Sequence, residues 1–238
     1  MEMRFSIVVA LVVGLVPIAS ADVILTSFGK VKITPVYHGS VMLEVGGKVW
    51  HVDPWSRGDY STLPRADVIL ITDVHGDHMD PKAIEAIRKP STIVIAPAAV
   101  ARTVTEAKII SNGEDVIVSG VRIEAVPMYN LKRGPAIGKL YHDKGRGNGY
   151  VLNVGDKRIY FSGDTEVQPE MKALKDIDVA FITMNLPYTM SPNEAAEGVK
   201  HFRPKVVYPY HYRGADLKVF VDALEGEKEI EVRLREWY

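Results

Sequence analysis

The sequence has 238 residues and contains no cysteine. That absence excludes disulfide bonds, catalysis by a thiol and any metal site built on thiolates. An excess of charge of one sign is also lacking, because 29 basic and 30 acidic residues leave a net charge of -1. A chain with this balance has no electrostatic reason to bind nucleic acid, so no nucleic-acid partner is expected.

Long apolar runs are almost absent as well. Residues 5–18 form one such run, and it lies between Arg4 and the small residues Ala-Ser-Ala at 19–21. This order is typical of a secretory signal peptide, whereas a membrane anchor, the alternative, needs about 20 apolar residues. We therefore predict that residues 1–21 are a cleaved signal peptide and that residues 22–238 form a single domain. The protein would be periplasmic or secreted, with no stable membrane span after cleavage.

The rest of the sequence alternates between short β-rich segments and capped helices. Strands are predicted at 31–37, 41–45, 48–52, 68–71, 92–95, 121–126, 150–154, 158–161, 179–183, 206–208 and 230–234. Helices are predicted from residue 81 onward and at 97–106, 192–202 and 215–224. The start at Ser191-Pro192-Asn193-Glu194 combines a capping box with proline at the first helical position. The second half repeats the element order of the first, and no linker divides the chain.

Four potential metal ligands follow the apolar segment 68–71 within six residues. They are Asp73, His75, Asp77 and His78. Carboxylate and imidazole groups suit Zn, Mn or Fe. The alternative is a polar turn that happens to be rich in histidine. However, buried polar clusters need partners, and a metal is the partner that fits this set.

Further polar residues also stand just beyond predicted strands. Asp53, Asp164 and His211 each come within three residues of the end of such a strand. In open sheet proteins, binding sites form outside the carboxyl ends of the strands. We therefore expect these three residues to join the ligand-rich segment in one constellation.

This constellation resembles the signature of the metallo-β-lactamase-fold metallohydrolases, which is His-x-His-x-Asp-His followed by a later His, a bridging Asp and a final His. Asp73 stands in place of the first His, Asp164 in Ser-Gly-Asp-Thr matches the bridging Asp, and His211 matches the final His. Asp53, followed by proline, matches an early Asp of the family. The resemblance covers essentially the whole mature chain and implies an α/β fold, a four-layer αβ/βα sandwich of two mixed β-sheets flanked by helices.

Shorter sequence segments indicate which branch of this family the chain resembles most. Tyr-His-Gly-Ser at 37–40, Val-Asp-Pro-Trp at 52–55 and Ser-Gly-Asp-Thr at 162–165 resemble the branch that contains ascorbate-6-phosphate lactonase and N-acylphosphatidylethanolamine phospholipase D. The segments 184–190 and 208–212 are similar to a subgroup of that branch usually described only as metal-dependent hydrolases.

The resemblance implies two divalent metal ions, with Zn favoured and Mn or Fe as alternatives, because a carboxylate at Asp73 shifts preference towards harder metals. The first site would use Asp73, His75 and Asp164. Asn130 stands where the family has its later His, and an amide oxygen is a weak ligand for Zn. His142 would supply the missing nitrogen if its loop folds inward.

The second metal site is complete by the same resemblance. Its ligands would be Asp77, His78, Asp164 and His211. Asp77 would also orient the attacking water, and Asp53 would accept a hydrogen bond from a ligand histidine and so fix its tautomer.

Other residues near these segments are candidates for substrate contact. His38 would touch substrate or donate a proton, or it is a simple turn residue. Arg146 and Arg213 would hold an anionic group, and Tyr188 would line the pocket, with solvated or packing roles as the alternatives. We expect residues 144–149 to form a mobile loop near the mouth of the site.

The function that these expectations support is metal-dependent hydrolysis of a small phosphodiester, lactone or related ester. One alternative is hydrolysis of β-lactams. The presence of Asp73 and Asn130 at positions where the family has histidine argues against it. A second is a non-enzymatic periplasmic metal-binding protein with a degraded site. A third is redox chemistry at a di-iron site, for which the sequence offers no flavin-binding segment. The sequence leaves a homo-oligomer open.

Overall fold

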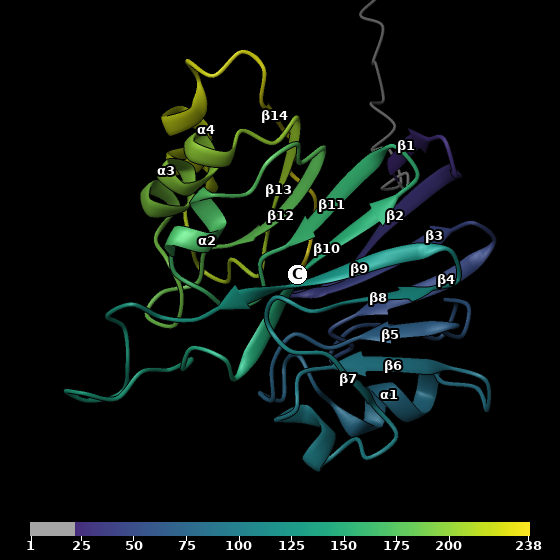
Figure 1. The fold of residues 1–238 in the computed structure, drawn as a ribbon. Coiled ribbons are helices and arrows are strands. Elements are labelled where there is room, and N and C mark those ends of the chain that lie inside the picture. Colours follow the sequence, from purple (N-terminus) through teal and green to yellow (C-terminus); the bar gives the residue numbers. More distant parts are fainter. Residues whose placement is uncertain (1–21) are drawn as a thin grey trace, which may run out of the picture.

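The computed structural model describes residues 22–238, and the predicted signal peptide lies outside them. Two seven-stranded β-sheets pack face to face, with helices on both outer sides (Figure 1). The first sheet consists, in spatial order, of β1 (Asp22–Thr26), β2 (Gly29–Tyr37), β3 (Ser40–Val45), β4 (Lys48–Val52), β5 (Val68–Leu70), β6 (Ile93–Ala96) and β7 (Lys108–Ile109). The second consists of β14 (Glu231–Val232), β13 (Val206–Tyr210), β12 (Val179–Thr183), β11 (Lys157–Phe161), β10 (Gly147–Val154), β9 (Val121–Met128) and β8 (Asp115–Val118). This arrangement is the predicted four-layer αβ/βα sandwich.

The two sheets have the same internal plan. In the first, β1 to β4 pair antiparallel and β4 to β7 pair parallel. In the second, β8 to β11 pair antiparallel and β11 to β14 pair parallel. Within each sheet, the carboxyl ends of the parallel strands therefore lie on the same side, and binding residues gather at these ends in open-sheet proteins.

Three apolar clusters hold the four layers together. The central cluster lies between the sheets and includes Trp50 from the first and Phe181 from the second. On one outer side α1 (Pro81–Ile87) packs against the first sheet. On the other side α2 (Pro169–Lys172), α3 (Pro192–Phe202) and α4 (Leu217–Leu224) cover the second sheet (Figure 1). No helix within residues 22–238 combines the length and the apolar character that a bilayer span requires.

The capping signals of the sequence are confirmed where they are strongest. In α3 the side chain of Ser191 accepts from Glu194 N, and the Glu194 side chain accepts from Ser191 N at 2.9 Å. The helix predicted at 97–106 is wrong, because only a 3-10 turn, Val100–Arg102, forms there. Its N-cap residue, Ala99, has no side chain able to accept a hydrogen bond, and the segment is rich in β-branched residues, which favour helices less.

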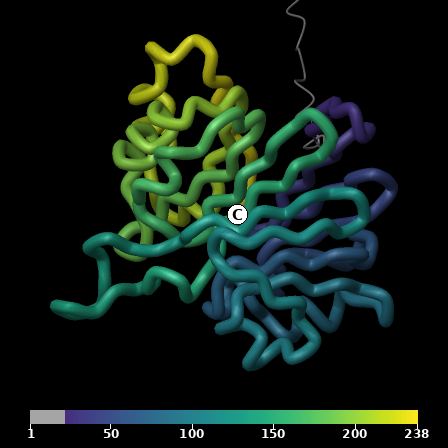
Figure 2. Tube along the Cα trace, viewed as in Figure 1, coloured from purple at the N-terminus to yellow at the C-terminus, as the bar shows by residue number. Residues whose placement is uncertain are grey.

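Residues 129–146 form an arm that leaves the second sheet after β9 and returns at β10 (Figure 2). Two backbone hydrogen bonds close it, from Asn130 N to His142 O (2.8 Å) and from Tyr141 N to Arg133 O (3.1 Å). Residues 141–146, the second half of the arm, therefore run back along its first half to the end of the sheet. This pairing brings His142 inward.

The mobile loop predicted at 144–149 is partly wrong, because β10 already begins at Gly147 and its first residues are buried. A Cβ on Gly147 would lie 2.8 Å from the carbonyl oxygen of Thr72 and would also collide with the end of the Met128 side chain. Only glycine allows the two sheets to approach so closely at this point.

Replacing Gly147 with alanine is expected to lower the free energy of unfolding by about 2–3 kcal/mol, because the backbone oxygen of Thr72 cannot move aside as a flexible side chain would. Urea unfolding of the metal-free protein measures this effect. Gly226→Ala is the matched control, since a Cβ there meets nothing within 4 Å and should leave stability nearly unchanged. Equal stability of the two variants would contradict the expected collision.

Candidate metal centre and its cavity

The candidate site lies beyond the ends of the central strands of both sheets. Asp53 directly follows β4, and His211 directly follows β13, while His38 occupies the turn between β2 and β3. These three residues have positive φ angles of 46°, 49° and 55°. Such a conformation is strained for any residue but glycine and persists where the surroundings enforce it. A hydrogen bond from His211 N to His38 O (3.0 Å) links the two sheets here.

One group of donors contains the four ligands predicted for the second metal site. His78 Nε2 lies 3.4 Å from Asp164 Oδ2 and 3.9 Å from Asp77 Oδ1. His211 Nε2 lies 3.4 Å from Asp164 Oδ1 and 3.4 Å from Asp77 Oδ2. These separations suit ligands around one shared ion, because metal–ligand bonds of about 2 Å place tetrahedral ligands more than 3 Å apart.

Asp53 lies behind this group and contacts His78. Its Oδ2 accepts from His78 Nδ1 at 2.8 Å and from Thr72 Oγ1 at 2.6 Å, and its Oδ1 accepts from Thr72 N at 2.7 Å. Because Nδ1 donates to Asp53, Nε2 of His78 faces Asp164 and Asp77 and is the nitrogen that can bind a metal ion once its proton is released. This is the contact that the sequence analysis assigned to Asp53.

Replacing Asp53 with asparagine is expected to weaken metal binding by about 10- to 100-fold, because one amide oxygen cannot accept from all three donors that now converge on the carboxylate. Competition with a chelating dye measures the affinity. Asp67→Asn is the control, since Asp67 accepts from Val49 N (2.9 Å) far from the site. An Asp53→Asn protein that binds metal as tightly as the unmodified protein would refute the role of Asp53.

A second group of donors gathers on the other side of Asp164. His75 Nδ1 lies 2.8 Å from Asp73 Oδ2. His142 Nε2 lies 3.9 Å from the same Asp73 oxygen and 3.5 Å from Asp164 Oδ2. The predicted first site thus contains three of its expected residues and gains its nitrogen from His142, carried inward by the arm.

Asn130 does not face the donors. Its Oδ1 accepts from His142 Nδ1 (2.7 Å) and from His142 N (2.8 Å), and its Nδ2 donates to Tyr188 O (2.8 Å). The last bond fixes which amide atom is the oxygen, so His142 must carry its proton on Nδ1. Nε2 then points a lone pair at the carboxylates, and Asn130 acts as an orienting group rather than as a ligand.

Arg146 also lies elsewhere than expected. Its guanidinium forms a bidentate ion pair with Asp73, from Nε to Oδ1 (3.1 Å) and from a terminal nitrogen to Oδ2 (2.9 Å), and it does not line the cavity. A histidine at position 73 would be neutral, so the positive charge of Arg146 offsets the extra negative charge of Asp73. The sequence signal for this partner was the carboxylate itself, which needs a cation when buried.

Several buried nitrogen and oxygen atoms lack any hydrogen-bond partner within residues 22–238. In the site they are His78 Nε2, His142 Nε2, Asp164 Oδ1 and both ring nitrogens of His211. Buried polar atoms are normally satisfied, and ring nitrogens that face carboxylate oxygens need a proton or a metal ion between the two groups. The donor set is nitrogen and carboxylate oxygen, as Zn²⁺ and similar ions require. The residues present therefore fit metal ions.

The electrostatics of the site agree with that fit. Burial lowers the pKa of His78, but the carboxylates of Asp164, Asp53 and Asp77 outweigh it and raise the pKa well above its usual value. Burial lowers the pKa of His142 to about 4, against the opposing charges of Asp164 and Asp73. In the metal-free protein the proton on His78 offsets the carboxylates, so metal binding must release it.

A cavity of about 490 Å³ opens over the two donor groups. Its lining consists of His38, Trp55, Arg57, His75, Gly76, Asp77, Tyr141, His142, Asp164, Asn185, Tyr188, His211 and Arg213. His38, Tyr188 and Arg213, predicted from the sequence, therefore border this space. Sequence reasoning missed Arg57 and Tyr141 as lining residues, because neither belongs to a motif. Trp55 appeared in the sequence analysis only as part of the motif at residues 52–55 and was not predicted to line a cavity.

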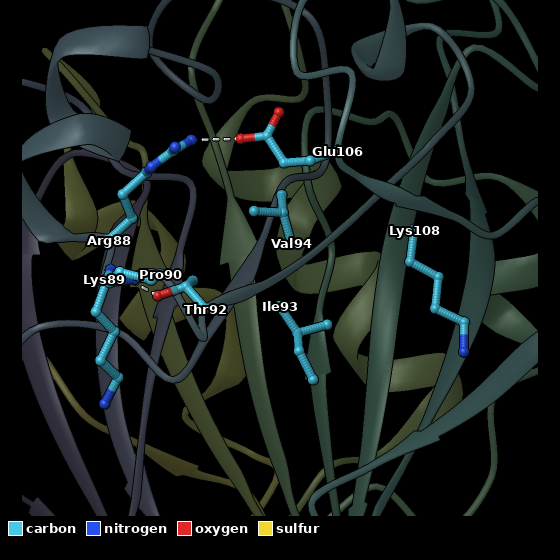
Figure 3. A pocket seen from close by; sticks show the side chains of 8 residues that line it. All are labelled: Arg88, Lys89, Pro90, Thr92, Ile93, Val94, Glu106 and Lys108. Atoms are coloured by element: carbon cyan, nitrogen blue, oxygen red, sulfur yellow. Dashed lines mark hydrogen bonds and ion pairs between the residues drawn. The ribbon is translucent and has the colours of Figure 1, made fainter.

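A second hollow of about 540 Å³ lies at the edge of the first sheet beside β6 and β7 (Figure 3). Its lining consists of Arg88, Lys89, Pro90, Thr92, Ile93, Val94, Glu106 and Lys108. Arg88 pairs with Glu106 across it (Figure 3). Lys89 pairs with Asp67 at 2.8 Å. With one carboxylate, already paired, and no histidine, this hollow offers no set of metal ligands.

The site consists of two sets of histidine and aspartate side chains that meet at Asp164, and it lies at one end of a sandwich of two β-sheets. This combination is typical of metallohydrolases with this fold. The Beta-lactamase superfamily domain matches residues 32–211. A UPF0173 metal-dependent hydrolase of Thermococcus onnurineus is 32% identical over 182 residues, which are 71% of this chain and 79% of that protein. The chain belongs to the beta-lactamase superfamily and, within it, to the UPF0173 metal-dependent hydrolases.

Solved structures agree with this assignment. A candidate metal-dependent hydrolase from Parabacteroides distasonis superposes with a TM-score of 0.86 at 44% sequence identity, over 92% of this chain and 99% of that one. Igni18, a metallo hydrolase from Ignicoccus hospitalis, has a TM-score of 0.73 at 25% identity, over 87% and 95% of the two chains. The predicted similarity to proteins described as metal-dependent hydrolases is thereby confirmed, and the protein is a metal-dependent hydrolase. The branch that contains ascorbate-6-phosphate lactonase and N-acylphosphatidylethanolamine phospholipase D stays a prediction.

Proposed function

We propose that this hydrolase uses two divalent ions, Zn²⁺ in the first instance, to cleave a small phosphodiester, lactone or related ester. The observation that carries the proposal is the position of Asp164, whose carboxylate lies within 3.5 Å of His142 in one group and of His78 and His211 in the other, together with the buried atoms there that lack a hydrogen-bond partner. The ligands of the first ion would be Asp73, His75, His142 and Asp164. Those of the second would be Asp77, His78, Asp164 and His211.

Divalent ions in these sites would activate a water molecule as the nucleophile and stabilise the negative charge that develops on the substrate. Asp77 keeps 28% of its side chain exposed and lines the cavity, so it can also accept a hydrogen bond from that water and orient it. The water oxygen forms the new bond to carbon or phosphorus while the bond to the leaving oxygen breaks. One proton of the water ends on the leaving group.

His38 holds Asp77 in place. Its Nε2 lies 3.3 Å from Asp77 Oδ2, and its Nδ1 lies 2.5 Å from the Tyr238 hydroxyl. Burial lowers the pKa of His38 to about 4, against the opposing effect of Asp77. The neutral ring therefore accepts from Tyr238 and donates to Asp77, which makes His38 a group that orients the carboxylate.

The first test is the metal content of the chain purified without chelators, measured by elemental analysis. We expect about two ions per chain and hydrolysis of bis(4-nitrophenyl) phosphate or of a simple lactone, lost with a chelator and restored by Zn²⁺, Mn²⁺ or Fe²⁺. A ratio near one would leave a mononuclear enzyme. A ratio of metal to protein near zero, which added metal does not raise, would instead favour the alternative of a degraded, non-enzymatic site.

Hydrolysis of β-lactams is the alternative substrate class. A chromogenic cephalosporin, assayed beside the ester substrates on the metal-loaded protein, separates the two. The proposal expects turnover of esters and little turnover of the cephalosporin, and the reverse order would replace it.

We also propose that the protein acts outside the cytoplasm, in the periplasm or as a secreted protein, after loss of residues 1–21. The support is the order of base, apolar run and small residues at the N-terminus. N-terminal sequencing of the protein from an exporting host should begin at Asp22, whereas a sequence that begins at Met1 would indicate a retained segment.

A further inference from the structure

One wall of the cavity is built from a tryptophan and two arginines. The guanidinium carbon of Arg57 lies 4.7 Å from the ring centroid of Trp55, and that of Arg213 lies 5.6 Å from the same ring. Trp55 and Arg57 follow β4 in the first sheet, whereas Arg213 follows β13 in the second. All three side chains line the cavity above the metal ligands. Two distant segments therefore bring positive charges to one aromatic surface.

These two charges are not neutralised inside the described part of the chain. Within residues 22–238 neither Arg57 nor Arg213 forms an ion pair, although Arg146, Arg233 and Arg235 all do. Stacking on an indole holds a guanidinium in place while its N–H donors stay free. Because both arginines line the same cavity, an anionic group there would meet two positive charges that no carboxylate of residues 22–238 pairs with.

We propose that Arg57 and Arg213 form an anion clamp across Trp55 that holds a carboxylate or phosphate group of the substrate, remote from the bond that is cleaved. The inference rests on the proposed function and names its substrate class, which is a small ester with a fixed negative charge besides the scissile group. Tyr141 and Tyr188, whose rings meet edge to face at 5.0 Å, also line the cavity and offer an apolar contact for the rest of the molecule.

Matched substrates test the clamp on the metal-loaded enzyme. The succinic acid mono(4-nitrophenyl) ester carries a carboxylate, its methyl ester is neutral, and a 3-phosphonopropionic acid 4-nitrophenyl ester carries a phosphonate in place of phosphate. We expect kcat/KM for one of the charged esters to exceed that of the neutral ester at least tenfold. Which charged ester is preferred distinguishes a carboxylate from a phosphate as the natural group.

The variant Arg57→Gln/Arg213→Gln should abolish this preference, with a loss of about 10- to 100-fold on the charged ester and little change on the neutral one. Arg102→Gln is the matched control, because Arg102 is exposed and lies outside the cavity. An equal loss on charged and neutral esters would show a structural role for the arginines. An undiminished preference in the double variant would exclude the clamp.

Binding without turnover gives an independent readout. Trp50 and Trp237 are at most 1% exposed, so Trp55 is the tryptophan whose fluorescence can respond to a ligand in the cavity. Titration with succinate and with inorganic phosphate, with and without metal, should change the emission in the unmodified protein and not in the double variant. If no ester is hydrolysed but this difference is found, the clamp stands and the proposed reaction fails. Identical titrations of the two proteins would overturn the clamp.

Discussion

Replacing Asp164 with alanine is expected to remove both ions of the proposed metal pair and to lower hydrolysis by about a thousandfold or more. One carboxylate oxygen of Asp164 lies 3.4 Å from His78 and 3.5 Å from His142, and the other lies 3.4 Å from His211. Asp164 therefore lies close to histidines of both donor groups. Its loss would therefore take an anionic ligand from both proposed ion sites at once and would leave the facing imidazoles without the negative charge between them.

Elemental analysis and the ester assay measure the two parts of this prediction. Asp156→Ala is the control, because Asp156 lies in the exposed turn between β10 and β11, where its carboxylate pairs with Lys157 at 2.7 Å. Circular dichroism shows whether both variants fold. A folded Asp164→Ala protein with full metal content and full rate would refute the shared-carboxylate site.

The parts of the fold that follow from local signals could be predicted from the sequence. Apolar runs such as Val179–Thr183 are buried strands, and the capping box at Ser191 begins α3 where expected. Short edge strands were missed, as with β7 and β8, because two to four residues at a sheet edge carry almost no pattern. The four-layer architecture itself came from the resemblance of the motifs, not from any single segment.

For the site, the sequence indicated the donors that stand next to strand ends. The structure brings all six residues predicted as ligands, from Asp73 to His211, close together around Asp164. It could not indicate where the arm between β9 and β10 would turn back, because hydrogen bonds such as Asn130 N to His142 O depend on the folded chain. For the same reason Arg146 was assigned to substrate, whereas its guanidinium binds Asp73.

Replacing His142 with alanine is expected to reduce the metal content from about two ions to one and to lower the rate about 100-fold or more, because the first group loses its one buried nitrogen that lies within 3.5 Å of Asp164. Replacing Asn130 with alanine should act more mildly. His142 would keep its nitrogen and lose its orienting acceptor, so the affinity for the weaker ion should fall about 10- to 100-fold while excess metal restores full occupancy.

The two variants decide between two readings of position 130. If the amide of Asn130 were itself the ligand, Asn130→Ala would lose an ion that excess metal cannot restore, and His142→Ala would retain both. Metal titration followed by elemental analysis distinguishes these patterns. His201→Ala serves as the control, because His201 is exposed on α3 and its ring nitrogen contacts the backbone oxygen of Glu197 at 2.7 Å. The burial of His142 beside two carboxylates, with its proton fixed on the far nitrogen by Asn130, favours the histidine as the ligand.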